Sequence, residues 1–152
     1  MINWKKGLIF ALFSALLLPF LTCTIHAEKK GFTVSGTIEF KQKGNLFIQM
    51  VTEEEFNSQK EARFEDTIAV DEKELQQHAA RFTFKDVPAG VYAINCFQDT
   101  NGNSKLDGGM LGPKEPWGVY RNARHVLKAP KFKEMAFSVQ DDITNIVINV
   151  KK

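Results

Sequence analysis

Beyond its N-terminal segment the chain alternates apolar and polar side chains in short runs, which is the pattern of β-strands that bury one face. In the first run, Phe32, Val34, Ile38 and Phe40 share one face. The pattern predicts strands at residues 32–40, 45–52, 67–70, 80–84, 91–98, 135–139 and 143–150. Because only the polar turn 41–44 separates the first two strands, we expect them to pair as a hairpin.

Two capping boxes interrupt the predicted strands. Thr52–Glu55 and Asp71–Glu74 each place a capping side chain three residues before a glutamate, directly ahead of an apolar residue. They predict short helices or turns near residues 53–60 and 72–78. This region is charged and only weakly apolar, so we expect it to be a surface excursion between strands.

The turn residues and the lack of long helical patterns together indicate the fold class. Residues 108–131 carry several Gly and Pro residues and are expected to be mostly irregular. No long amphipathic helix is predicted, and the predicted strands are short. The sequence therefore indicates an all-β protein, a single antiparallel β-sandwich of about seven strands, Ig-like or prealbumin-like, after an N-terminal signal helix.

The N-terminus has the order of regions that is typical of a secretory signal peptide. Lys5 and Lys6 precede the apolar stretch Gly7–Leu21, which is shorter than the roughly 20 residues of a membrane-spanning helix. A short, less apolar region follows, and cleavage is predicted after Ala27. Its -3 residue, Ile25, is tolerable for cleavage but less favourable than alanine.

The predicted cleavage divides the chain into a signal peptide, residues 1–27, and an exported domain, residues 28–152. The protein would then be periplasmic or secreted, and it would contact the membrane only through the signal before cleavage. The alternatives are an uncleaved anchor and a lipoprotein attached through Cys23, although the residues before Cys23 match a lipoprotein signal poorly.

Removal of the signal changes the charge balance and the cysteine count. The full chain carries 20 Lys and Arg against 18 Asp and Glu, and residues 1–27 hold Lys5 and Lys6 but no acid. The exported part therefore balances 18 basic and 18 acidic residues, which gives no electrostatic reason to expect nucleic acid as a partner. Cys23 leaves with the signal, and Cys96 alone cannot form an internal disulfide.

Oxygen-bearing side chains recur at every second residue from the end of the strand predicted at 91–98. Asp99, Asn101 and Asn103 take the first, third and fifth ligand places of a calcium-loop template. Lys105 would offer its backbone carbonyl, and Asp107 takes the ninth place. With only two certain carboxylates, the affinity would be weak, about 10⁻⁴ to 10⁻³ M in dissociation constant. Calcium is therefore the candidate cofactor.

The same loop departs from the calcium template in two places. Ser104 stands where the template has a sharp-turn glycine, and Met110 stands where it has a bidentate glutamate. Glu115 could supply a third acid. The alternative is a turn in which Asn and Asp side chains bond to their own backbone, with Asn101-Gly102 supplying a positive φ.

The segment Pro113–Gly118 is a second candidate site. Trp117 could be exposed and stack on a sugar or a ring, or it could cap one end of the sandwich together with Leu111. The neighbouring stretch Tyr120–Arg124 could form a small polar pocket with Glu115. The candidate ligand-binding residues are Glu115, Trp117, Tyr120 and Arg121.

The remaining chemistry-bearing residues do not form a recognisable site. His78, His125 and Cys96 lack the spacing of metal ligands. Cys96 shares a strand face with Tyr92 and Ile94, so it is predicted to be a small core residue. The sequence contains no serine-nucleophile motif, phosphate-binding loop or HExxH motif.

An ordered series of motifs resembles one known family. The motifs are Phe82–Phe84, Val87–Ile94, Phe97–Asp107, Leu111–Gly118 and Pro130–Phe137. Together they resemble the exported bacterial proteins of domain of unknown function 2141 over residues 32–150, although Ser104 replaces a usual glycine. The resemblance implies an envelope or secreted location and a small β-sandwich, with no known activity. The stretch 82–92 also resembles prealbumin-like domains, which concerns the fold alone.

The leading hypothesis is a non-enzymatic binding or accessory module of the cell envelope. Its partner would be an envelope protein or a glycan, and its 99–107 loop would bind calcium weakly. One alternative is a hydrolase-type enzyme that uses Asp99, Asp107 or Glu115 as acid and base, although the sequence shows no positioned partner for them. Another is a purely structural accessory protein.

Overall fold

The computed structural model describes residues 31–110, 112–122 and 129–152. Strands dominate and the helices are short, so the chain is an all-β protein. In chain order the elements are β1 (Phe32–Glu39), β2 (Asn45–Val51), α1 (Glu53–Ser58), β3 (Phe64–Ile68), α2 (Glu72–Gln77), β4 (Ala79–Val87), β5 (Gly90–Asp99), β6 (Gly108–Gly109), β7 (Gly112–Pro113), β8 (Trp117–Val119), η1 (Tyr120–Asn122), α3 (Phe132–Met135), β9 (Phe137–Val139) and β10 (Ile143–Asn149). The predicted signal peptide, residues 1–27, lies outside the described residues, as do Cys23, Leu111, Arg124 and His125.

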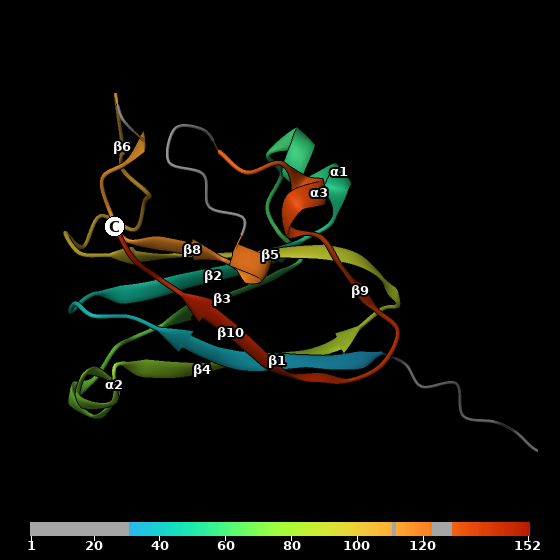
Figure 1. Cartoon of the computed structure of the whole chain (residues 1–152), viewed down its shortest axis with the longest axis horizontal. Helices are drawn as coiled ribbons and strands as arrows, with labels where there is room; N and C mark the ends of the chain where they lie inside the picture. The colour runs from blue at the N-terminus through green and yellow to red at the C-terminus, as the bar shows by residue number, and fades with distance from the viewer. Residues whose placement is uncertain (1–30, 111, 123–128) are drawn as a thin grey trace, which may run out of the picture.

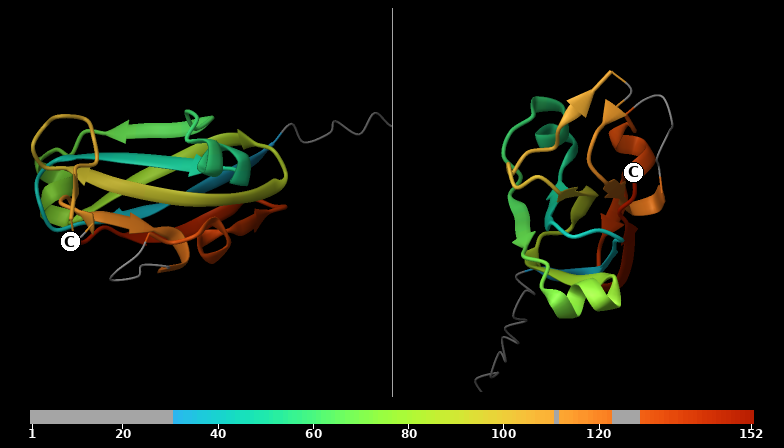
Figure 2. Two further views of the ribbon diagram at one scale, coloured as in Figure 1. Left: turned by 90° about the horizontal axis from the view of Figure 1, so that it is seen from above. Right: turned by 90° about the vertical axis from the view of Figure 1, so that its left-hand side faces the viewer.

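Two main sheets organise the strands. One has three strands in the order β10-β1-β4, and the other has the order β3-β2-β5-β8, with β9 also paired to β5. The short β6–β7 hairpin forms a separate pair. Figure 1 shows the two sheets as two layers, and the end-on view in Figure 2 shows α2 beside the lower layer and α1 and α3 above the upper one.

Both sheets contribute side chains to one hydrophobic core. Because successive side chains of a strand point to opposite faces, every second residue can face the other sheet. The predicted face of β5, with Tyr92, Ile94 and Cys96, is buried in this core, which confirms that prediction. The core comprises Val34, Ile38, Phe40, Leu46, Ile48, Met50, Ala80, Phe82, Phe84, Val87, Tyr92, Ile94, Cys96, Phe137, Val139, Ile146, Ile148 and Val150.

The predicted hairpin of the first two strands is wrong. β1 pairs with β10 and β4, whereas β2 pairs with β3 and β5. The connection between β1 and β2 instead carries the chain from one sheet to the other. At its end Gly44 has a φ of +143°, and a Cβ there would lie 2.2 Å from the carbonyl oxygen of Asp99. The side-chain amide of Gln98 donates to the carbonyl of Gln42 at 2.6 Å and fixes this crossing.

The prediction of a wholly antiparallel arrangement is also wrong, because β1 and β10 run parallel. A parallel pair needs a long connection between its strands, and here the rest of the domain provides it. The pairing shifts register between Val34 and Gly36. A Cβ at Gly36 would lie 2.1 Å from the carbonyl oxygen of Ile146, so only glycine allows this close approach.

The two predicted capping boxes are confirmed. The Thr52 hydroxyl accepts from the Glu55 N–H while the Glu55 carboxylate accepts from the Thr52 N–H, and Asp71 and Glu74 do the same for α2. Between them β3 begins at Phe64, earlier than the strand predicted at 67–70, and it joins the edge of the five-stranded sheet. The excursion therefore contributes a sheet strand.

Residues 112–122 contain more regular structure than their Gly and Pro residues predicted, namely β7, β8 and η1. β8 pairs with β5 in the five-stranded sheet, and α3 ends at Met135. The strand predicted from residue 135 therefore begins only at Phe137. The last strand, predicted at 143–150, is confirmed as β10.

Helices α1 and α3 cover one half of the outer face of the five-stranded sheet. Phe56 of α1 and Phe132 of α3 have ring centroids 5.9 Å apart. Together with strand residues they form a second buried cluster, which we call the covered half; it comprises Val51, Ala62, Ala93, Val119, Phe132 and Met135. In the part of the chain that the structure describes, the helices are too short or too polar to cross a membrane.

Candidate functional site

The 99–107 loop begins where β5 ends and leads into the β6–β7 hairpin. Figure 1 shows the hairpin rising on the same side of the five-stranded sheet as α1 and α3. The candidate site thus lies at one end of this sheet.

Asp99 organises the loop through its carboxylate, although only 3 % of the residue is exposed. One carboxylate oxygen accepts from the N–H groups of Gly102 at 2.7 Å, Asn103 at 3.2 Å and Asn101 at 3.3 Å, and the other accepts from the Ser104 N–H at 2.8 Å. Burial pushes the pKa of Asp99 upward, but these four N–H groups outweigh burial and hold it below its usual 3.8. Asp99 is therefore an ionised, structural carboxylate at neutral pH.

The side chains of Asn101, Asn103 and Asp107 converge at the exposed side of the loop. Both asparagine amides donate to the same Asp107 oxygen, Asn101 at 2.7 Å and Asn103 at 3.1 Å. Their carbonyl oxygens accept from backbone N–H groups two residues later, those of Asn103 and Lys105. These are the side-chain-to-backbone bonds of the turn interpretation. A cation at the same place would require the amides to turn their oxygens toward Asp107.

The backbone of the loop follows the sharp turn that the calcium template requires. Gly102 has a φ of +78°, as predicted for the Asn-Gly pair, and Ser104 has a φ of +59°. Ser104 thus adopts the left-handed conformation in which glycine is usual. The missing glycine therefore does not prevent the turn.

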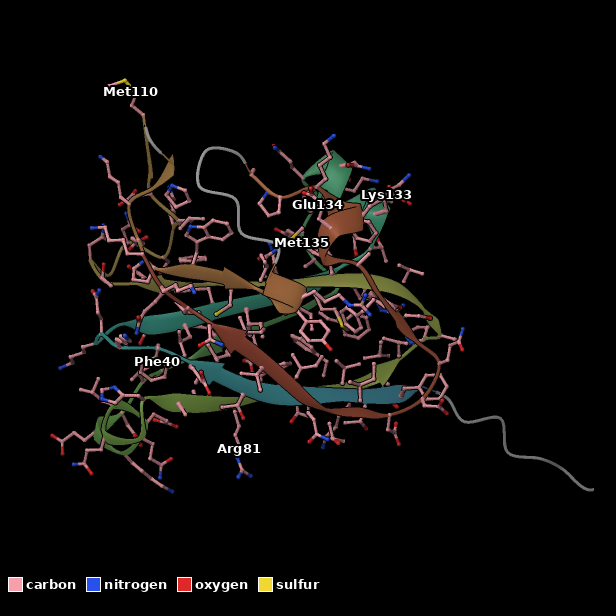
Figure 3. All side chains as sticks on the ribbon, viewed as in Figure 1. Phe40, Arg81, Met110, Lys133, Glu134 and Met135 are labelled. Carbon is pink, nitrogen blue, oxygen red and sulfur yellow. The ribbon has the colours of Figure 1, made fainter. Side chains whose placement is uncertain are left out.

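Glu115 ties both ends of the loop together. It is 3 % exposed, and its carboxylate accepts from the Thr100 N–H at 2.8 Å and from the Asp107 N–H at 3.3 Å. The Lys114 N–H in turn donates to the Asp107 carbonyl at 2.8 Å. Met110, at the twelfth place of the template, is fully exposed at the hairpin tip and points away from the body of the molecule (Figure 3).

The other candidate ligand-binding residues lie on β8 and η1. Trp117 is half-buried, packs against the covered half, and exchanges backbone hydrogen bonds of 3.2 Å with Lys151. Tyr120 packs edge-on against Phe137 with centroids 5.1 Å apart. Arg121 is exposed at a φ of +65°. Glu115 forms its bonds with Thr100 and Asp107. Since Arg124 lies outside the described residues, the small polar pocket stays a prediction.

Cys96 and His78 occupy structural positions. Burial raises the pKa of the Cys96 thiol well above its usual range, so this thiol stays protonated and unreactive in the folded state. His78 ends α2 with a φ of +52°. Among the described residues, no three His, Cys, Asp or Glu side chains are grouped to hold a metal ion.

The sequence interpretation missed a groove of about 510 Å³ on the outer face of the five-stranded sheet. It lies over β2, β3 and β5 and reaches Ser104 of the loop. We call this region the open half; its side chains are Phe47, Gln49, Glu65, Thr67, Asn95 and Phe97. Phe47 and Phe97 stack with centroids 4.9 Å apart and an interplanar angle of 6°.

Strand register arranges this face in two rows. Thr67, Phe47, Phe97 and Trp117 stand opposite one another across β3, β2, β5 and β8. The next row contains Glu65, Gln49, Asn95 and Val119. The signal in the sequence is that β2 is apolar on both faces, with Phe47 between the core residues Leu46 and Ile48.

Comparison with known protein families identifies the same family that the sequence motifs resemble. A family described as uncharacterized protein conserved in bacteria (DUF2141) matches residues 33–147. The chain belongs to this family. The DUF2141 match runs from the second residue of β1 into β10 and includes the loop, Glu115 and the open half. No curated protein and no solved structure matches the chain significantly.

Proposed function

We propose that this DUF2141 protein is a non-enzymatic binding or accessory module of the bacterial cell envelope, exported by a signal peptide at residues 1–27. The observation that carries the proposal is the use of the loop carboxylates. Asp99 and Glu115 are both buried and both accept backbone N–H groups, so they hold loops in place. The lowered pKa of Asp99 makes it a poor proton donor at neutral pH, which disfavours the hydrolase alternative.

We also propose that the domain is a β-sandwich of the Ig-like or prealbumin-like kind. The support is the single core to which both sheets contribute. In such a fold the loops at the ends of the strands are free to vary, and they commonly carry the binding residues. The 99–107 loop and the Pro113–Gly118 segment lie together at one such end.

The loop is proposed to bind calcium weakly through Asp99, Asn101, Asn103 and Asp107, with the carbonyl of Lys105. Asn101, Asn103 and Asp107 already converge, and Ser104 follows the required turn. A bound cation would replace the two amide bonds to Asp107 with metal–oxygen bonds. It would thereby stiffen the end of the sheet near Glu115 and Trp117.

The candidate recognition residues for an envelope protein or glycan are Glu115, Trp117, Tyr120 and Arg121. Of these, Arg121 is exposed and Trp117 is half-buried at the edge of the open half. Glu115 would act by positioning the loop. If Trp117→Ala changes neither the stability of the protein nor its capture of envelope partners, this recognition end is wrong.

The calcium proposal is tested by thermal unfolding of the purified protein in about 10 to 100 mM calcium, which is about 100 Kd for the expected affinity, and in chelator. Ligand binding to the native state stabilises it by RT ln(1 + [L]/Kd), so the midpoint should rise by a few degrees at about 100 Kd. Asp107→Ala should abolish the rise, whereas the matched control Asp141→Ala, an exposed aspartate outside the loop, should retain it. An equal unfolding midpoint in calcium and in chelator would contradict the calcium proposal and favour a turn that is held only by its own hydrogen bonds.

A further inference from the structure

The open half leaves two large aromatic side chains beside water on the outer face of the sheet. Phe47 and Phe97 are only half-buried, and their ring planes lie nearly parallel in the stack. The helices that cover this face pack against the other half, on Val51, Ala93 and Val119. Large aromatic residues are usually buried, so a stacked aromatic pair left partly open to water is a feature that a binding site would explain.

The row next to the aromatic one offers polar groups. Within the part of the chain that the structure describes, no hydrogen bond engages the side-chain amides of Gln49 and Asn95. Since the two rows are two residues apart along each strand, they are separated by roughly 7 Å. A ligand lying on the Phe47–Phe97 surface would therefore have hydrogen-bonding groups beside it and Ser104 at the opposite border.

The charge of the groove restricts the class of ligand that could bind there. Its lining contains Glu65 and Asp66 but no lysine or arginine. Among the described residues, neither acid has an ion-pair partner. An acidic ligand would meet uncompensated repulsion here, whereas a neutral or amine-bearing ligand would not.

We propose that the open half binds a glycan without acidic groups. A pyranose ring has apolar C–H faces, which can pack against the open side of the stacked Phe47–Phe97 pair, and hydroxyl groups at its edge, which can bond to Gln49 and Asn95. Amine groups of an amino sugar would face Glu65, which stands in the same row as Gln49 and Asn95. The aromatic pair would supply apolar contact area for the sugar, and the hydrogen bonds from the polar row would fix the orientation of the sugar in the groove.

This site extends the proposed envelope-binding function and names its partner class, but it does not need calcium. The groove shares only Ser104 with the loop, and its rows are set by strand pairing. Failure of the calcium proposal would therefore leave glycan binding intact, and the two are separated by measuring binding in calcium and in chelator.

The test is titration calorimetry of the purified protein with three β-1,4-linked tetrasaccharides, of glucose, of glucosamine and of an acidic uronic sugar. We expect one of the first two to bind at least tenfold more tightly than the acidic one. Phe97→Ala should weaken that binding about tenfold, the size of a lost aromatic contact. Gln49→Ala should weaken it as well, and since that side chain makes no hydrogen bond among the described residues, folding should not be affected.

The matched control is Phe56→Ala, which removes a half-buried aromatic side chain from the covered half of the same sheet face. It should retain binding once corrected for the folded fraction. Three outcomes would overturn the proposal: none of the three sugars binds at millimolar concentration, the acidic sugar binds as tightly as the others, or Phe97→Ala and Gln49→Ala both bind like the original protein.

Discussion

The two halves of the outer face of the five-stranded sheet are built on the same strands but have opposite surroundings. In the covered half, Val51, Ala93 and Val119 lie under α1 and α3 and are nearly inaccessible. In the open half, the same strands carry Phe47 and Phe97, which nothing in the described chain covers to the same degree. On these strands, the small apolar residues lie under the helices of the protein itself. The large aromatic residues lie in the half where a ligand could bind.

The largest effect is expected in the covered half, from Met135→Ala. Met135 is 1 % exposed and fills the space between α3 and the sheet. Its removal should lower the free energy of unfolding by about 3 kcal/mol, because the lost contacts leave a cavity. Denaturant unfolding measures this value. A loss below about 1 kcal/mol would mean that α3 does not close this half of the sheet.

The next largest effect concerns the loop that borders the open half. Asp99→Asn should lower stability by about 2 kcal/mol at neutral pH, because four N–H groups lose a charged acceptor. The folded pKa lies below the unfolded 3.8, so the stabilisation is present above that pH and is lost as the pH falls through the folded pKa. The stability difference between original and variant, followed by denaturant unfolding from pH 7 to pH 2, should therefore shrink in acid.

The exposed aspartate Asp141 provides the control for that pH series. Asp141→Asn should give a stability close to that of the original protein at every pH, within about 0.5 kcal/mol. If the Asp99→Asn difference stayed constant down to pH 2, the carboxylate charge would not be the source of the stabilisation.

A smaller loss is expected in the open half, from Phe97→Ala. Because the side chain is only half-buried, its removal should cost about 1 kcal/mol of unfolding free energy. The measurement is the same denaturant unfolding, carried out beside Met135→Ala. Equal losses for the two variants would remove the contrast between the two halves.

The smallest change is expected for Gln49→Ala. Its side chain makes no hydrogen bond among the described residues, so stability should stay within about 0.5 kcal/mol of the original. The expected change is confined to sugar binding. A clear destabilisation would show that Gln49 is part of the fold and would weaken its assignment to the groove.

Local features of the fold could be predicted from the sequence, and distant pairings could not. The capping boxes at Thr52 and Asp71 involve residues three positions apart, so the pattern alone located α1 and α2. The first two strands are close in sequence yet lie in different sheets, because the chain crosses over at Gly44. No local pattern shows that β10 pairs with β1.

The candidate site also has one part that is local in the sequence and one part that joins distant strands. Asn101, Asn103 and Asp107 converge because of their spacing along one loop, the same spacing from which the sequence proposed them as calcium ligands. Calcium binding itself stays a prediction. The groove joins Phe47 and Phe97 from two strands about 50 residues apart, and only their register places one ring on the other. A periodicity analysis could have noted that β2 is apolar on both faces, but it could not have found the partner ring.

The parallel pairing of β1 and β10 has a consequence for the order of folding. During synthesis β1 emerges first and can pair with β4 early, but its other edge stays open until the last strand is made. The core also lacks Ile146 and Ile148 until then. Contacts between such distant segments slow folding. The nascent chain would therefore remain incompletely folded until its synthesis is nearly complete, which is the form in which a polypeptide can still be threaded through a narrow channel.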